Sequence, residues 1–95
     1  MKIIPSPKSD KKWRAVFKDG THTDFGAKGM MDYTLYYKEN KELAEKRKAA
    51  YQARHKKDLA TGDPKRAGFL SFYLLWTEPT LESALRKYQA KYPDL

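Results

Sequence analysis

Hydrophobic residues are densest near the C-terminal third of the chain, where residues 63–76 read D-P-K-R-A-G-F-L-S-F-Y-L-L-W. This is the only long apolar run in the sequence, so we expect the core to form around it. Asp63 and Pro64 are residue types typical of a helix N-cap and first turn. The run therefore predicts a helix that is apolar nearly all round and buried.

Polar and apolar residues alternate upstream, between Lys12 and Lys18. Asp19-Gly20 follows, a dipeptide that favours a two-residue type I′ turn, and residues 21–25 provide a second extended segment. The pattern predicts a β-hairpin. An isolated hairpin is only marginally stable in water, so one of its faces should lie on the apolar run.

The middle of the chain predicts a long and highly charged helix. Asn40 is a good N-cap, and residues 41–59 contain neither glycine nor proline. Its predicted apolar face is thin and consists of Leu43, Ala50, Tyr51 and Ala53. Most of this helix is therefore expected to face solvent.

A last helix is predicted between the prolines at positions 79 and 93. Its apolar side chains recur at helical spacing, at Leu81, Ala84, Leu85, Tyr88 and Tyr92. The whole pattern predicts an α+β fold, with an N-terminal β-hairpin packed on about three α-helices. Residues 12–95 are expected to form a single compact domain, and residues 1–11, which contain two prolines, a flexible basic arm without core contacts.

The distribution of charge along the chain indicates a function. The 95 residues carry a net charge of +8, and residues 41–66 hold nine Lys/Arg against four Asp/Glu, whereas residues 67–95 hold three of each. A basic middle beside a neutral apolar end is the arrangement expected of a protein that meets polyanions. The predicted contacts to nucleic-acid phosphates are Lys28, Lys46, Arg47, Lys48, Arg54, Lys56, Lys57, Lys65 and Arg66.

Two further features fit this interpretation, and each has a structural alternative. Tyr36 and Tyr37 could stack on bases, or they could belong to the rim of the core. Gly26-Ala27-Lys28-Gly29 could direct backbone N–H groups at an anion, or it could be a plain turn.

No reaction is predicted. The chain has two histidines and no cysteine, so a closed zinc site is not expected, and no acidic cluster suits Mg²⁺. His55 and Asp58 have the spacing of a base and its orienting carboxylate, but both lie on the charged helix and are expected to be solvated. We therefore expect a protein that is not an enzyme and that needs no metal or cofactor.

An ordered set of short motifs resembles a family of small basic proteins of unknown function that are encoded by large DNA viruses of algae and amoebae. The motifs are Phe25–Met30, Asp32-Tyr33-Thr34, Tyr51 with Arg54-His55, Asp63–Ser71, Leu74-Leu75-Trp76 and Pro79-Thr80-Leu81. The resemblance implies no catalytic residues. It implies location in a virion or an infected host cell, in the nucleus or cytoplasm.

The sequence therefore predicts a small nucleic-acid-binding protein that contacts the phosphate backbone without sequence preference, with DNA expected rather than RNA. The alternative is a structural or adaptor protein, either a minor virion component or a module that binds viral or host proteins. No membrane association is expected, because no apolar run is long enough to span a bilayer. No secretion is expected, because Met1–Pro7 is too short and too broken by proline to be a signal peptide. A homodimer is a further alternative, because few elements are available to cover the apolar run.

Overall fold

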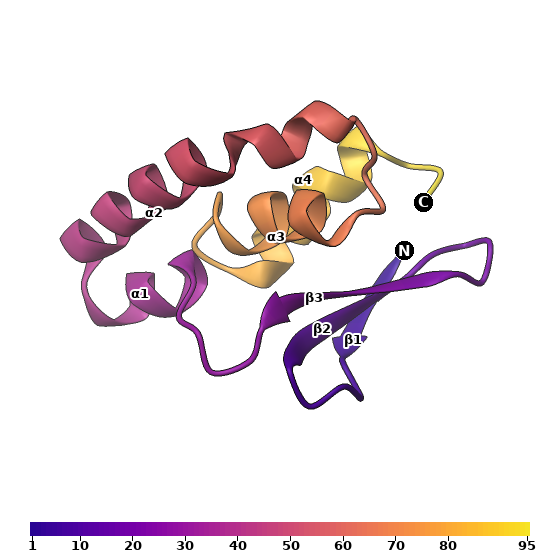
Figure 1. Cartoon of the computed structure of the whole chain (residues 1–95), viewed down its shortest axis with the longest axis horizontal. Coiled ribbons are helices and arrows are strands. Elements are labelled where there is room, and N and C mark those ends of the chain that lie inside the picture. The colour runs from indigo at the N-terminus through magenta and orange to yellow at the C-terminus, as the bar shows by residue number, and fades with distance from the viewer.

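The computed structural model describes residues 1–95 and has a three-stranded antiparallel sheet followed by four α-helices (Figure 1). The strands, in spatial order, are β1 (Lys2–Pro5), β2 (Lys11–Val16) and β3 (His22–Ala27). The helices are α1 (Tyr33–Glu39), α2 (Lys41–His55), α3 (Ala67–Leu75) and α4 (Leu81–Lys91), and a 3₁₀ helix, η1 (Lys56–Thr61), continues α2. The predicted α+β class is confirmed.

The β2–β3 hairpin forms where the sequence predicts it, and its inner face is apolar. Ala15 and Phe25, on neighbouring strands, are both 0% exposed. The turn differs from the prediction, because Gly20 is its only residue with positive φ (87°) and donates its N–H to the carbonyl of Phe17 at 3.0 Å. The connection is therefore a type I turn followed by a left-handed glycine, not a two-residue type I′ turn.

The predicted N-terminal arm contains a third strand. β1 pairs antiparallel with β2, placing Ile3 opposite Ala15, and Ile3 packs against the core. The prediction that this segment lacks core contacts is wrong. Pro5 and Pro7 argued against a strand, but proline is tolerated at a sheet edge, where its missing N–H leaves no partner unsatisfied.

Two capping side chains define the α1–α2 pair. Asp32 accepts the N–H of Leu35 at 3.3 Å and starts α1. Asn40 accepts the N–H of Leu43 at 3.1 Å, and its own N–H donates to the carbonyl of Tyr36 at 2.9 Å. Asn40 thus ends α1 and starts α2, as predicted for the start of the long helix.

α2 turns a different face inward from the predicted one. Ala44 is fully buried, and the half-buried Lys48, Tyr51 and His55 follow it at helical spacing. Three members of the predicted face are exposed instead, namely Leu43, Ala50 and Ala53.

Polar side chains on the inner face of α2 explain why the sequence predicted a different buried face. The Lys48 ammonium donates to the carbonyl of Thr77 at 3.2 Å, and the Gln52 amide donates to the carbonyl of Trp76 at 2.9 Å. Carbonyls at a helix C-terminus have no partner within the helix, so these contacts satisfy the end of α3. α2 therefore packs through hydrogen bonds that hydrophobic periodicity does not detect.

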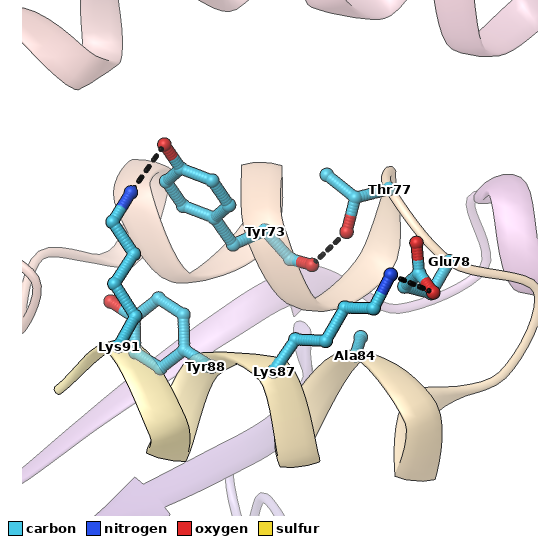
Figure 2. Close-up of a pocket in the computed structure, with 7 residues that line it drawn as sticks. All are labelled: Tyr73, Thr77, Glu78, Ala84, Lys87, Tyr88 and Lys91. Atoms are coloured by element: carbon cyan, nitrogen blue, oxygen red, sulfur yellow. Dashed lines mark hydrogen bonds and ion pairs between the residues drawn. The ribbon is translucent and has the colours of Figure 1, made fainter. Parts of the chain in front are cut away.

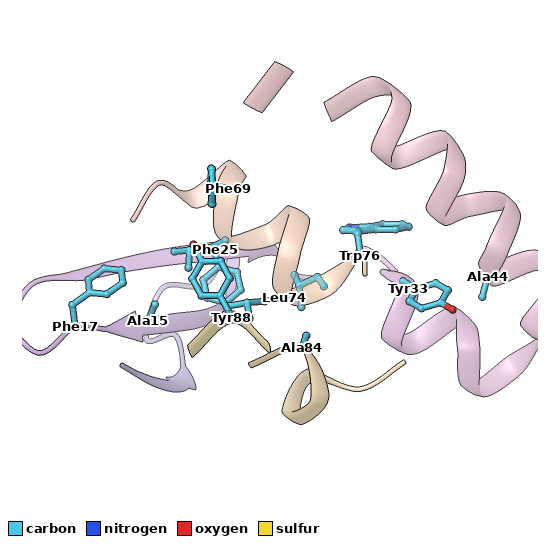
Figure 3. Packing of buried hydrophobic residues seen from close by; sticks show 12 residues of the cluster. Ala15, Phe17, Phe25, Tyr33, Ala44, Phe69, Leu74, Trp76, Ala84 and Tyr88 are labelled. Carbon is cyan, nitrogen blue, oxygen red and sulfur yellow. The ribbon is translucent and has the colours of Figure 1, made fainter. Parts of the chain in front are cut away.

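α3 is the buried centre of the fold, as predicted. Leu70 and Leu74 are 0% exposed, and α3 lies between the sheet and the other helices. Figure 3 shows Phe25, Leu74 and Tyr88 gathered between the sheet, α3 and α4, with Trp76 carrying the apolar cluster toward α1 and α2. The chain thus has one continuous core.

The start of α3 is later than predicted. Its N-cap is Arg66, and residues 63–66 form a turn in which the Asp63 carboxylate accepts the N–H of Lys65 at 3.0 Å. Asp63 therefore caps this turn, whereas the sequence placed it at the helix N-terminus. The helix that follows is correspondingly shorter.

α4 matches its prediction. Thr80 caps it by accepting the N–H of Ser83 at 3.1 Å, and Ala84 and Tyr88 on its predicted face are buried. The Tyr88 hydroxyl donates to the carbonyl of Pro64 at 2.6 Å, which joins the last helix to the turn before α3. None of these helices combines the length and apolar character that crossing a membrane requires.

Candidate functional site

A groove of about 480 Å³ opens between α2 and the segment that joins β3 to α1. The C-terminal end of α3 forms its floor with Ser71, Leu75 and Trp76. α2 forms one wall, and residues from positions 26–32 contribute to the opposite wall. We call this cavity the groove.

Three of the aromatic rings that line the groove form a continuous stack. Tyr51 lies on Trp76 with centroids 4.2 Å apart and planes 5° apart, and on His55 with centroids 4.1 Å apart and planes 22° apart. Because Trp76 and His55 both stack on Tyr51 at such short distances, they must cover opposite faces of its ring. Burial raises the pKa of the Tyr51 hydroxyl to about 12, so it stays neutral under ordinary conditions.

Two arginines on α2 border the groove without an acidic partner. Arg47 and Arg54 are both exposed, and neither forms an ion pair. They are seven residues apart, which places them two helical turns and about 10 Å apart on the same side of α2. The Arg47 guanidinium lies 5.9 Å from the centre of the Tyr36 ring, which also lines the groove.

The opposite wall holds a charged pair that is neutral as a unit. Asp32 is the only buried polar residue of the chain, and its carboxylate accepts from the Lys12 ammonium at 2.8 Å and from the Thr34 hydroxyl. This is the only carboxylate that lines the groove, and Lys12 compensates its charge. The net charge of the lining is therefore positive.

A second hollow of about 360 Å³ adjoins the groove, and Lys12 and Asp32 line both. It adds Lys11 and Lys28, and also Trp13, which is half-buried. Unpaired cations thus lie on both sides of the neutral Lys12–Asp32 pair, with Arg47 and Arg54 in the groove and Lys11 and Lys28 in the adjoining hollow.

The structure separates the nine predicted phosphate contacts into two groups. Six are exposed and form no ion pair, namely Lys28, Lys46, Arg47, Arg54, Lys56 and Lys57. Of these, only Arg47 and Arg54 line the groove and Lys28 lines the adjoining hollow. Lys46 is two residues from the buried Ala44 and projects from the opposite side of α2.

The other three are already engaged within the protein. Lys48 contacts a backbone carbonyl and lies 4.8 Å from the centre of the Tyr33 ring. Lys65 pairs with Asp19, and this hydrogen bond holds the pKa of the Asp19 carboxyl well below its usual range. Arg66 lies 3.8 Å from Asp63.

Of the two candidate stacking tyrosines, only one lines the groove. Tyr36 lines the groove and is tilted by 49° against Trp76 at 6.3 Å. Tyr37 does not line the groove; its ring packs edge-on against Tyr33 at 5.6 Å, with the ammonium of Lys41 at 5.2 Å. Only Tyr36 is placed where a bound strand could meet it together with the arginines.

The glycine loop is a turn in which backbone N–H groups donate to backbone carbonyls of the protein itself. The Lys28 N–H donates to the carbonyl of Asp10 at 3.1 Å, and the Met30 N–H donates to the carbonyl of Ala27 at 3.2 Å. These bonds favour the plain turn over the anion-binding loop. The exposed side chain of Lys28 keeps its charge available.

Sequence reasoning missed the residues that make the groove a cavity. Met30, Met31, Trp76 and Tyr51 line it, and they come from three separate segments of the chain. Spacing along α2 was the one usable signal, because Tyr51 and His55 lie one turn apart and stack. His55 also contacts Asp58 at 3.1 Å, as their spacing suggested. No three His, Cys, Asp or Glu side chains gather in a way that could hold a metal ion.

A smaller cleft of about 220 Å³ between α3 and α4 offers fewer free groups (Figure 2). The Lys91 ammonium lies 3.3 Å from the Tyr73 hydroxyl, and that of Lys87 lies 2.9 Å from the Glu78 carboxylate. The hydrogen bond from Lys87 lowers the pKa of Glu78. The charged groups of this cleft are therefore paired with partners inside it, whereas the arginines of the groove are not.

Comparison with known proteins gives one match. The model of a family of unknown function (DUF5754) matches residues 1–55, which include the sheet, α1 and α2. The first three motifs named above lie inside this range, and those from Asp63 onward lie outside it. No curated protein and no solved structure matches the chain at a significant level.

Proposed function

Given that the chain belongs to the family of unknown function DUF5754, we propose that it is a small nucleic-acid-binding protein that contacts the phosphate backbone without sequence preference. The observation that carries this proposal is the pair of unpaired arginines beside an aromatic groove whose one carboxylate is already neutralised. Phosphates supply the negative charge that such a surface lacks. DNA is the expected partner.

Charge distribution supports the same proposal. Five of the six predicted contacts that are exposed and unpaired lie on α2 and η1, and the sixth, Lys28, lies in the hollow beside the groove. Exposed cations without an ion pair also occur on β1 and α4, but none of these lines the groove. Solubility alone does not need two unpaired arginines at one aromatic cavity. The protein is therefore expected to bind polyanions on the α2 side.

The motifs from Asp63 onward, which lie outside the family match, contribute to the resemblance to viral proteins. On the resemblance to proteins of large DNA viruses, we propose that the protein acts in the virion or the infected host cell, in association with the viral genome. Isolation of virions followed by mass spectrometry of their proteins tests this. Absence of the protein from virions, together with its presence in infected cells, would place it with host-directed factors.

One observation favours a second candidate, a structural or adaptor protein. Met30 is 65% exposed, and Leu35 and Leu43 are 37% and 36% exposed. These apolar side chains on the β3–α1–α2 region could contact a viral or host protein. A partner that is retained after nuclease treatment would favour this candidate over the first.

Fluorescence anisotropy with labelled duplex and single-stranded DNA over a salt series tests the proposed function. If six phosphates are contacted, duplex affinity should fall by roughly 10³ between about 50 and 200 mM salt. Arg54→Ala should reduce the steepness of the salt dependence by about one phosphate contact. Arg86→Ala removes an exposed arginine of α4 that does not line the groove, and it should leave the steepness of the salt dependence unchanged. Binding that does not respond to salt would overturn the proposal.

A further inference from the structure

The size and lining of the groove are those of a small-ligand site. Its volume of about 480 Å³ falls within the range of roughly 300–1,000 Å³ that is typical of such pockets. Eight of the fifteen residues that line it are hydrophobic. A site that binds only phosphates does not need an apolar lining, whereas a site that binds a nucleobase does.

Four aromatic rings line the groove, namely Tyr36, Tyr51, His55 and Trp76. Tyr51 has Trp76 on one face and His55 on the other, so neither of its faces is free. Tyr36 is half-buried, is tilted against Trp76 and is not stacked flat on it, and the Arg47 guanidinium lies over its ring. A base that contacts this ring would therefore also meet Arg47. Met31 also lines the groove, and thioethers adapt readily to aromatic surfaces.

The charged groups lie where the phosphate attached to such a base would be. Arg47 and Arg54 are on the α2 wall, and Arg47 is directly beside Tyr36. A guanidinium presents paired donors to phosphate oxygens and stays charged at all ordinary pH values. Base contact and phosphate contact can therefore occur in the same groove.

We propose that the groove binds an unpaired nucleotide of a single strand, with the base against Tyr36 and Met31 and the phosphate at Arg47 and Arg54. This inference rests on the proposed function and narrows it. A base inside a duplex is stacked and paired, and it cannot enter a cavity without leaving the helix. The protein should therefore prefer single strands to duplexes of the same sequence.

The test compares three probes by fluorescence anisotropy at one salt concentration. They are a short oligothymidylate, a strand of equal length with abasic sites throughout, and a duplex of equal length. The first two carry the same phosphates, so they differ only in their bases. Stacking of one base should make the oligothymidylate bind about 5-fold to 150-fold more tightly than the abasic strand.

Variants of two adjacent tyrosines locate the effect. Tyr36→Ala should bring the ratio of the two affinities close to one, and Tyr36→Phe should keep it. Tyr37→Ala changes the neighbouring residue, which does not line the groove, and should also keep it. Circular dichroism establishes that each variant is folded, and the comparison of probes on the unaltered protein needs no variant.

Several outcomes overturn this inference, and they can be told apart. Equal affinity for the abasic strand, or tighter binding of the duplex, with a steep salt dependence would leave the proposed function standing without the nucleotide site. Displacement of the strand by an equimolar amount of thymidine monophosphate would assign the groove to a free nucleotide. Absence of binding to every strand would overturn the proposed function as well.

Discussion

Gly26 lies where β3 comes close to α3, and an alanine there should destabilise the protein more than one at a comparable glycine. Its φ is 79°, and a Cβ at this position would lie 3.0 Å from Leu75 Cδ1 and 3.4 Å from Lys12 Cβ. Gly20 has a φ of 87°, but a Cβ there would meet nothing within 4 Å. The two positions share backbone strain and differ in steric contact.

The magnitudes follow from these two components. Left-handed backbone costs a non-glycine residue roughly 1–2 kcal/mol, so Gly20→Ala should lower the free energy of unfolding by that amount. Extra volume in a packed region costs roughly 1–3 kcal/mol, which should bring Gly26→Ala to a total of about 2–5 kcal/mol. The difference between the two variants isolates the contact with Leu75 and Lys12.

Urea unfolding followed by far-UV circular dichroism measures both variants. In a Leu75→Ala background, most of the steric component should disappear, and the two glycine substitutions should then cost similar amounts. Equal destabilisation by Gly20→Ala and Gly26→Ala in the otherwise unaltered protein would refute the close approach of β3 to α3.

Three further predictions concern single side chains. Lys48→Met should lower the free energy of unfolding by about 1 kcal/mol because it removes a backbone contact, whereas Lys46→Met should change it by less than about 0.5 kcal/mol, both measured by urea unfolding. The hydrogen bond from Arg14 lowers the pKa of Asp24 to about 2. The ionised Asp24 carboxylate therefore stabilises the folded state fully at pH values above the usual carboxyl pKa of about 3.9, and this stabilisation is lost as the pH falls toward 2. The free energy of unfolding of Asp24→Asn should lack this loss when it is measured over the same pH range. A pH dependence equal to that of the unaltered protein would contradict the prediction. Tyr88→Phe leaves a carbonyl without its donor and should cost about 1–2 kcal/mol in calorimetric unfolding.

Much of the fold was predictable because its determinants are local. Asp19-Gly20 marked the hairpin, Asn40 marked the start of the long helix, and the spacing of residues 81–92 marked the inner face of α4. Each of these signals lies within the element that it specifies.

The errors arose where partners are distant in sequence. β1 is held by pairing with β2, and α2 is oriented by Lys48 and Gln52, which bond to carbonyls more than twenty residues away. A polar side chain on an inner face is read from sequence as a solvent-facing one. Its carbonyl partner becomes visible only in the fold.

The candidate site shows the same division. Charge and residue type identified Arg47, Arg54 and Tyr36 as candidates, and these three lie together at the groove. The sequence could not show that Lys48 and Lys65 are engaged by other parts of the protein, because Thr77 and Asp19 lie far from them along the chain. Nor could it show the groove, because four segments assemble it.

A nuclear magnetic resonance titration of ¹⁵N-labelled protein with a short single-stranded oligonucleotide tests the central claim most directly. If the groove is the binding surface, the chemical-shift changes should concentrate on residues 30–36 and on α2 near Arg47 and Arg54, and the amides of α4 should stay in place. Changes that centre on α4, or that spread evenly over every lysine-bearing surface, would contradict this account.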